Sequence, residues 1–80
     1  MIKIFTLLML LVSFVFAVVN VNKANSAQLQ TLNGIGPSKA GEILKYRKSH
    51  GSFKTVDELV NVKGIGPKTL QNMKSQVSLR

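Results

Sequence analysis

The chain has 80 residues, which allows one small domain at most. It has no cysteine, so no disulfide reinforces a chain this short. Eleven Lys and Arg residues stand against three acids, and the net charge of +8 favours a polyanionic partner, namely nucleic acid, anionic lipid or acidic glycan, over a merely solvated basic surface.

The first 17 residues have the pattern of a secretory signal peptide. Lys3 gives a positive start, residues 4–19 are apolar except for Thr6 and Ser13, and a small residue, Ala17, stands at the exit. We therefore expect cleavage after Ala17 and a domain formed by residues 18–80 that faces away from the cytoplasm. A retained membrane anchor over residues 4–19 is the alternative, although the apolar run is slightly shorter than the ~20 residues of a spanning helix.

Residues 18–33 predict a short lead-in followed by a helix. Residues 18–23 form the lead-in, in which Val19-Asn20-Val21-Asn22 alternates apolar and polar residues but is too short to be trusted as a strand. Asn25 is a good helix N-cap, and Gln28 is placed to complete a capping box. The first helix is expected from Ser26 to Leu32 or Asn33.

The segment Gly34-Ile35-Gly36 then predicts a sharp turn, because glycine adopts backbone angles that other residues avoid. Pro37 suits the first position of a second helix, which we expect to run to Ser49. An apolar stripe at helical spacing (Ala40, Ile43 and Leu44) faces the core.

The second half of the chain repeats this order. After a connector around Gly51 and Phe53, Thr55 opens a third helix with Glu58 as its capping-box partner. Gly64-Ile65-Gly66 forms the second turn, and Pro67 starts a fourth helix. The tail, residues 78–80, is expected to fray.

The repeat extends beyond the two turns. Each turn sits at the same place in a matching unit, with apolar residues repeating thirty positions apart. Such internal repetition predicts a repeated supersecondary unit. The expected fold is therefore all-α, with four short helices arranged as two pseudo-equivalent hairpins.

A glycine turn that leads into a helix favours anion binding. The first amides of a helix lack internal partners, and they lie at the positive end of the helix dipole. Two such turns at fixed separation suit a polymer with regularly spaced phosphates. The predicted binding residues are those of both turns and their polar neighbours: Gly34, Ile35, Gly36, Ser38, Lys39, Lys63, Gly64, Ile65, Gly66, Lys68 and Thr69. Lys45, Arg47 and Lys48 would either extend this basic track or only solvate the surface of the second helix.

Residues 29–40 resemble the helix-hairpin-helix motif, and residues 59–70 resemble its partner copy. With the lead-in, the connector and the signal sequence, the order resembles the ComEA-type competence proteins. The resemblance implies an extracytoplasmic receptor that binds double-stranded DNA during natural transformation. Backbone amides of both hairpins would hold phosphates without reading sequence. Asn33 stands where the family often has proline, which implies a looser first hairpin.

No catalytic constellation is visible in the sequence. His50 is the only histidine, Asp57 and Glu58 are best explained by their place at a helix start, and Tyr46 and Phe53 are expected in the core. We therefore expect no enzyme activity, no metal, no cofactor and no small-molecule substrate. Components of a DNA-uptake machinery are further expected partners. The alternatives are an exported protein-interaction module and a basic membrane-surface protein.

Overall fold

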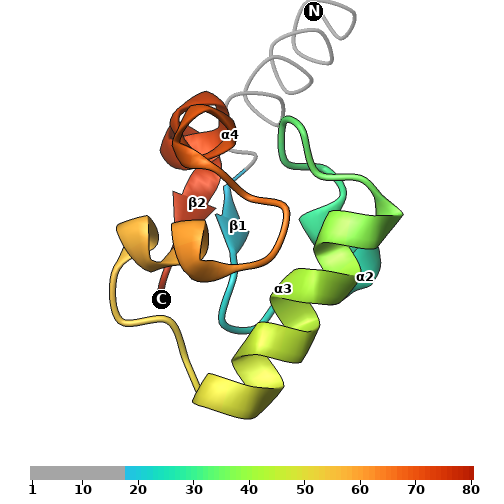
Figure 1. The fold of residues 1–80 in the computed structure, drawn as a ribbon, viewed down its shortest axis with the longest axis vertical. Helices are drawn as coiled ribbons and strands as arrows, with labels where there is room; N and C mark the ends of the chain where they lie inside the picture. Colours follow the sequence, from blue (N-terminus) through green and yellow to red (C-terminus); the bar gives the residue numbers. More distant parts are fainter. Residues whose placement is uncertain (1–17) are drawn as a thin grey trace, which may run out of the picture.

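The computed structural model describes residues 18–80, and the predicted signal peptide lies outside this range. The elements, with η for a 3₁₀-helix, are β1 (Val19–Asn20), α2 (Ser26–Leu29), α3 (Pro37–His50), η1 (Val56–Asn61), α4 (Pro67–Met73), η2 (Lys74–Gln76) and β2 (Val77–Ser78). The described part is mostly helical, as predicted, with a short strand pair in addition (Figure 1). None of the helices in residues 18–80 combines the length and apolar character needed to cross a membrane.

The first helix starts where the sequence predicts and ends earlier. Asn25 Oδ1 accepts from the Gln28 amide at 2.8 Å, and Gln28 Oε1 accepts from the Asn25 amide at 2.9 Å. This capping box satisfies two amides at the helix start. α2 ends at Leu29 because the amides of Thr31 and Leu32 bond three residues back, which tightens the chain into the turn.

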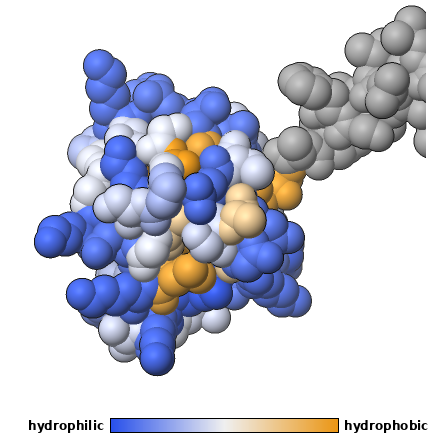
Figure 2. All heavy atoms as spheres, turned by 90° about the vertical axis from the view of Figure 1, so that its right-hand side faces the viewer, coloured by the Kyte–Doolittle hydropathy of each residue, from blue (hydrophilic) through white to orange (hydrophobic). Residues whose placement is uncertain are grey.

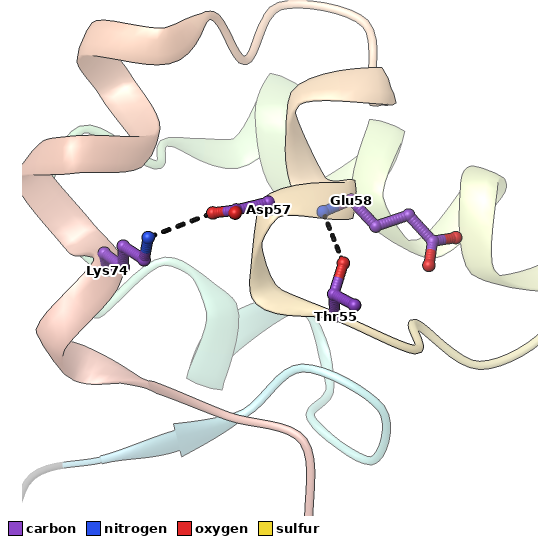
Figure 3. A network of polar contacts seen from close by, with 4 residues as sticks. All are labelled: Thr55, Asp57, Glu58 and Lys74. Atoms are coloured by element: carbon purple, nitrogen blue, oxygen red, sulfur yellow. Dashed lines mark hydrogen bonds and ion pairs between the residues drawn. The ribbon is translucent and has the colours of Figure 1, made fainter.

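The third predicted helix is a 3₁₀-helix, η1, and its cap is half of the predicted capping box. Thr55 Oγ1 accepts from the Glu58 amide at 3.2 Å, while the Glu58 side chain points away from Thr55 (Figure 3). The Glu58 carboxylate instead accepts from the Lys54 amide at 2.9 Å and from the Tyr46 hydroxyl at 3.0 Å. An exposed ion pair links Asp57 to Lys74 at 3.0 Å, and Asp57 extends from η1 in the direction opposite to Glu58 (Figure 3).

The internal repeat reappears in the hydrophobic core. The buried apolar residues are Val21, Ala24, Leu29, Leu32, Ile35, Ala40, Ile43, Phe53, Leu59, Val62, Ile65, Leu70 and Met73. Ten of these thirteen form five pairs that lie thirty positions apart, from Leu29 and Leu59 to Ile43 and Met73. Each repeat therefore contributes an equivalent set of side chains, and residues 18–80 contain a hydrophobic core of their own.

The two ends of the described chain pair with each other, so the predicted frayed tail is wrong. β1 and β2 form a parallel ladder with Val19 opposite Val77 and Asn20 opposite Ser78, and they lie side by side in Figure 1. The Val21 amide extends the ladder by donating to the Ser78 carbonyl at 3.0 Å. This strand pair is the departure from a strictly all-α fold.

Candidate nucleic-acid interface

The two glycine turns have matching backbone geometry. The first glycine of each turn has a positive φ, +81° at Gly34 and +92° at Gly64. Such angles strain any residue with a side chain, so glycine is required at both positions. The Ile35 amide donates to the Leu32 carbonyl at 3.1 Å, and the Ile65 amide donates to the Val62 carbonyl at 3.0 Å. The hydrogen bond that closes the turn is therefore also repeated.

The second glycine of each turn is the N-cap of the following helix. Gly36 and Gly66 are extended, with φ near −95° and no side-chain cap. A Cβ at either position would meet no atom within 4 Å. These glycines are therefore not required by backbone strain or by packing, and they leave the amides at the start of α3 and α4 open to a ligand.

The isoleucine between the glycines fixes each turn to the core. Ile35 is 4% exposed and Ile65 is 3% exposed. Their side chains point inward, so only their backbone is available to a ligand. This placement is compatible with the predicted role of Ile35 and Ile65, which is to offer backbone amides to phosphates.

The two turns also contact each other reciprocally. A Cβ on Gly34 would lie 3.5 Å from the Thr69 methyl group, in the first turn of α4. A Cβ on Gly64 would lie 3.5 Å from Cγ of Lys39, in the first turn of α3. The Lys39 ammonium donates to the Gly34 carbonyl at 3.3 Å. Each turn therefore lies against the start of the helix that follows the other turn.

Residues from both turns line one shallow hollow of about 390 Å³. The lining comes from the start of α3 and from the second turn: Gly36, Pro37, Ser38, Lys39, Glu42, Lys63 and Gly64. The hollow thus brings together five of the eleven predicted site residues, namely Gly36, Ser38, Lys39, Lys63 and Gly64. The positive end of the α3 dipole and the two lysines favour an anion there.

The remaining predicted side chains flank this hollow. Ser38, Lys63 and Lys68 are exposed, whereas Lys39 and Thr69 are half-buried by their contacts across the turns. Glu42 also lines the hollow and forms no ion pair in residues 18–80. Its carboxylate therefore places a negative charge in the hollow beside Lys39 and Lys63.

Asn33 does not loosen the first turn. Its amide donates to Gln76 Oε1 at 3.1 Å, and its side-chain nitrogen donates to the Asn72 carbonyl at 3.3 Å. Both bonds join the first turn to the segment around the end of α4. The expectation of a looser hairpin is therefore wrong, because asparagine supplies contacts that a proline could not make.

Arg47 does not belong to the basic track. Its guanidinium donates from Nη1 to the carbonyls of Val21 and Ala24, both at 2.9 Å. It therefore joins α3 to the lead-in before α2. Lys45 and Lys48, the other predicted extensions, are exposed on α3.

A second hollow continues from the first along α3. It shares Glu42 and Lys63 with the hollow at the turns and reaches Tyr46 and His50. His50, the last residue of α3, stacks on Tyr46 with ring centroids 4.1 Å apart, and Phe53 stacks on Tyr46 at 5.2 Å. Phe53 is buried as predicted, while Tyr46 is only half-buried. The molecular surface in Figure 2 is mainly hydrophilic, with small apolar areas between projecting polar side chains.

No group of three or more His, Cys, Asp or Glu side chains in residues 18–80 is arranged to hold a metal ion. Among residues 18–80, Glu58 is the one group whose pKa is clearly shifted from its ordinary value. The Lys54 amide, with the Tyr46 hydroxyl and the charges of Lys54 and His50, holds the pKa of Glu58 below its ordinary value. This carboxylate joins η1 to the amide of Lys54 and to Tyr46 of α3.

The sequence matches the family model described as "Helix-hairpin-helix motif" over residues 16–78. The matched range includes both glycine turns and all thirteen core residues. The chain therefore belongs to the helix-hairpin-helix family.

Individual relatives give a more specific comparison than the family model does. The chain is 41% identical over 64 residues to "ComE operon protein 1" of Bacillus subtilis, covering 80% of this chain and 31% of that protein. It is 39% identical over 59 residues to a Haemophilus influenzae protein named only "Uncharacterized protein", covering 72% of this chain and 53% of that one. The predicted likeness to the ComEA type is thereby confirmed.

A third relative is named for a domain of an enzyme family. "Endonuclease/exonuclease/phosphatase family domain-containing protein 1" of Rattus norvegicus is 39% identical over 59 residues, covering 74% of this chain and 10% of that protein. This chain thus spans between about a tenth and about half of the length of these three relatives.

Proposed function

We propose that this protein binds double-stranded DNA without sequence preference, outside the cytoplasm, as a receptor in DNA uptake during natural transformation. The two glycine turns act as a pair of hairpins whose backbone amides hold phosphates on the two sides of one groove. Lys63, Lys68, Ser38 and Thr69 add charge and hydroxyl donors beside them. Phosphate contacts position a protein on a duplex but carry no base information.

One observation carries the proposal: two turns of the same backbone form each lie against the start of the helix that follows the other, and residues of both line one hollow beside Lys39 and Lys63. A single anion needs only one such turn. A duplex backbone presents phosphates at regular spacing, so it can occupy both. The ten basic and three acidic side chains of residues 18–80 strengthen binding to any polyanion of this kind.

The uptake role rests on the relatives and on the predicted export. A relative named for the ComE operon supports a part in competence, with components of an uptake machinery as further partners. The first 17 residues are proposed as a signal peptide that delivers the domain to the periplasm, or as part of an anchor spanning residues 4–19. The domain is proposed to bind and not to catalyse, and it corresponds to 10% of the relative whose name includes an endonuclease/exonuclease/phosphatase family domain.

The test is fluorescence anisotropy of residues 18–80 with unrelated duplex and single-stranded DNAs, titrated over salt. Circular dichroism and a cooperative melt establish that the fragment is folded. With about four to six phosphates engaged, log K should fall against log salt with a slope of about −4 to −5 on every duplex. A folded fragment that binds no duplex at low salt contradicts the proposal.

Substitutions at the second glycines test the site itself. Gly36→Leu and Gly66→Leu place a bulky side chain over the open amides, so each should reduce duplex affinity at least about ten-fold. Both positions have ordinary φ values and free space, so the melting temperature should stay close to that of the wild type. Gly41→Leu is the matched control, because Gly41 is an exposed glycine of α3 outside the turn, also with free space.

These variants also separate the alternatives. If Gly36→Leu and Gly66→Leu bind DNA like Gly41→Leu, the turns are not the DNA site. Vesicle binding by the folded fragment without DNA binding would favour a membrane-surface role. A protein-interaction module would instead depend on exposed apolar positions such as Val60, which is 39% exposed.

A further inference from the structure

The side chain of Lys39 contacts both glycine turns at once. Its ammonium donates to the carbonyl of Gly34 in the first turn, at 3.3 Å. Its aliphatic stem crosses Gly64 in the second turn, where a Cβ would lie 3.5 Å from Cγ and 3.8 Å from Cε. Lys39 is accordingly half-buried, whereas Lys68, one position earlier in the repeat, is exposed.

The equivalent residue in the second repeat makes the reciprocal contact. Thr69 stands thirty positions after Lys39, and its methyl group lies 3.5 Å from the Cβ position of Gly34. The third residue of each helix therefore lies on the first glycine of the opposite turn. Only Lys39 adds a hydrogen bond to its own turn, so it joins the two turns more fully than Thr69 does.

We propose that Lys39 is a positioning residue that fixes the distance between the two glycine turns, and not a phosphate ligand. This inference rests on the proposed function. Two turns can hold phosphates of one duplex only if their separation matches the phosphate spacing, because such contacts fix the position of a protein on the duplex. The stem of Lys39 keeps Gly64 in place, and its ammonium is already bound to the Gly34 carbonyl.

A pair of substitutions distinguishes the stem from the charge. Lys39→Met keeps most of the stem and removes the ammonium, while Lys39→Ala removes both. If the stem positions Gly64, duplex affinity should fall about three-fold in the methionine variant and about ten-fold or more in the alanine variant. Lys68 is the matched control: Lys68→Met and Lys68→Ala should lose equal affinity, because only the charge of Lys68 acts on DNA.

A second measurement needs no DNA. In the free fragment, Lys39→Ala should shift the amide resonances of Gly64 and Ile65, and Lys68→Ala should leave the amide resonance of Gly34 in place. Alanine favours helix, so Lys39→Ala should not prevent folding. This readout reports the contact between Lys39 and the second turn directly.

The outcomes are separable. Equal losses in Lys39→Met and Lys39→Ala, each with a salt slope reduced by about 0.9 and unmoved Gly64 resonances, identify Lys39 as a phosphate contact and overturn the inference alone. Failure of the wild-type fragment to bind any duplex overturns the proposed function, and the inference with it. A larger loss in the alanine variant, with shifted Gly64 resonances, establishes the positioning role.

Discussion

At the scale of single residues, Asn22 connects three segments that are distant in sequence. Its Nδ2 donates to the carbonyls of Phe53 and Leu79, both at 3.1 Å, and its Oδ1 accepts from the Phe53 amide at 2.6 Å. The side chain therefore holds the lead-in, the connector and the C-terminal tail together. Nothing in the sequence distinguishes it from the other asparagines, because all of its partners are backbone groups far along the chain.

We expect Asn22→Ala to lower the free energy of unfolding by about 1–3 kcal/mol, because it leaves a partly buried donor and two acceptors without partners. Chemical denaturation of the folded fragment measures this loss. Asn61→Ala is the control: Asn61 is exposed, and its side chain forms no hydrogen bond within residues 18–80. Equal stabilities of the two variants would show that the Asn22 bonds contribute nothing beyond those to water.

At the scale of elements, the Glu58 carboxylate connects η1 to the chain before it and to α3. It accepts from the Lys54 amide and the Tyr46 hydroxyl, which lowers the pKa of Glu58. A folded-state pKa below the unfolded one adds stability at pH values above the unfolded pKa, and this stability is lost as the pH falls through the folded pKa. Glu58→Gln should therefore melt below the wild type near pH 7, and the difference should vanish under strongly acidic conditions.

Thermal melts between neutral and acidic pH test this prediction. Glu42→Gln removes a carboxylate that has no hydrogen bond or ion pair within residues 18–80, so it serves as the matched control. A constant difference between Glu58→Gln and the wild type at all pH values would mean that the charge of Glu58 does not stabilise η1.

The starts of the elements could be predicted from sequence, because they depend on neighbouring residues. Asn25 and Thr55 cap helices with side chains that bond three residues ahead, and Pro37 and Pro67 stand at the first helical positions. The two turns follow from glycine in the same way. The hydrogen-bond partners of the Glu58 and Arg47 side chains could not be predicted, because tertiary packing brings those partners close.

The same distinction applies to the candidate site. The repeat predicts which residues form the two turns, because each turn is a local structure. It does not predict that Lys39 lies across Gly64, because that contact joins the two repeats. From sequence, Lys39, Arg47 and Lys68 are all surface cations. In the folded domain, Lys39 lies between the turns, Arg47 is bound to backbone carbonyls, and Lys68 is exposed.

At the scale of the whole domain, the two ends of residues 18–80 are bonded to each other. The β1–β2 ladder and the bond from Asn22 to the Leu79 carbonyl join the lead-in to the tail, and Val77 and Leu79 pack against the core. Arg47 anchors the same lead-in to α3. A domain of about sixty residues buries a limited fraction of its surface, so each such closure matters for its stability.

Removing residues 77–80 should therefore lower the melting temperature of the folded fragment by at least about 4 °C, the shift that a loss of about 1 kcal/mol causes in a domain of this size. Removing Arg80 alone is the control, since it deletes the last charge and leaves the strand pair in place. Because the turns lie outside the ladder, both truncated fragments should still bind duplex DNA at temperatures well below their melting points. An unchanged melting temperature in the longer truncation would mean that the tail only rests on the domain, and loss of DNA binding by the folded protein would place the tail in the interface.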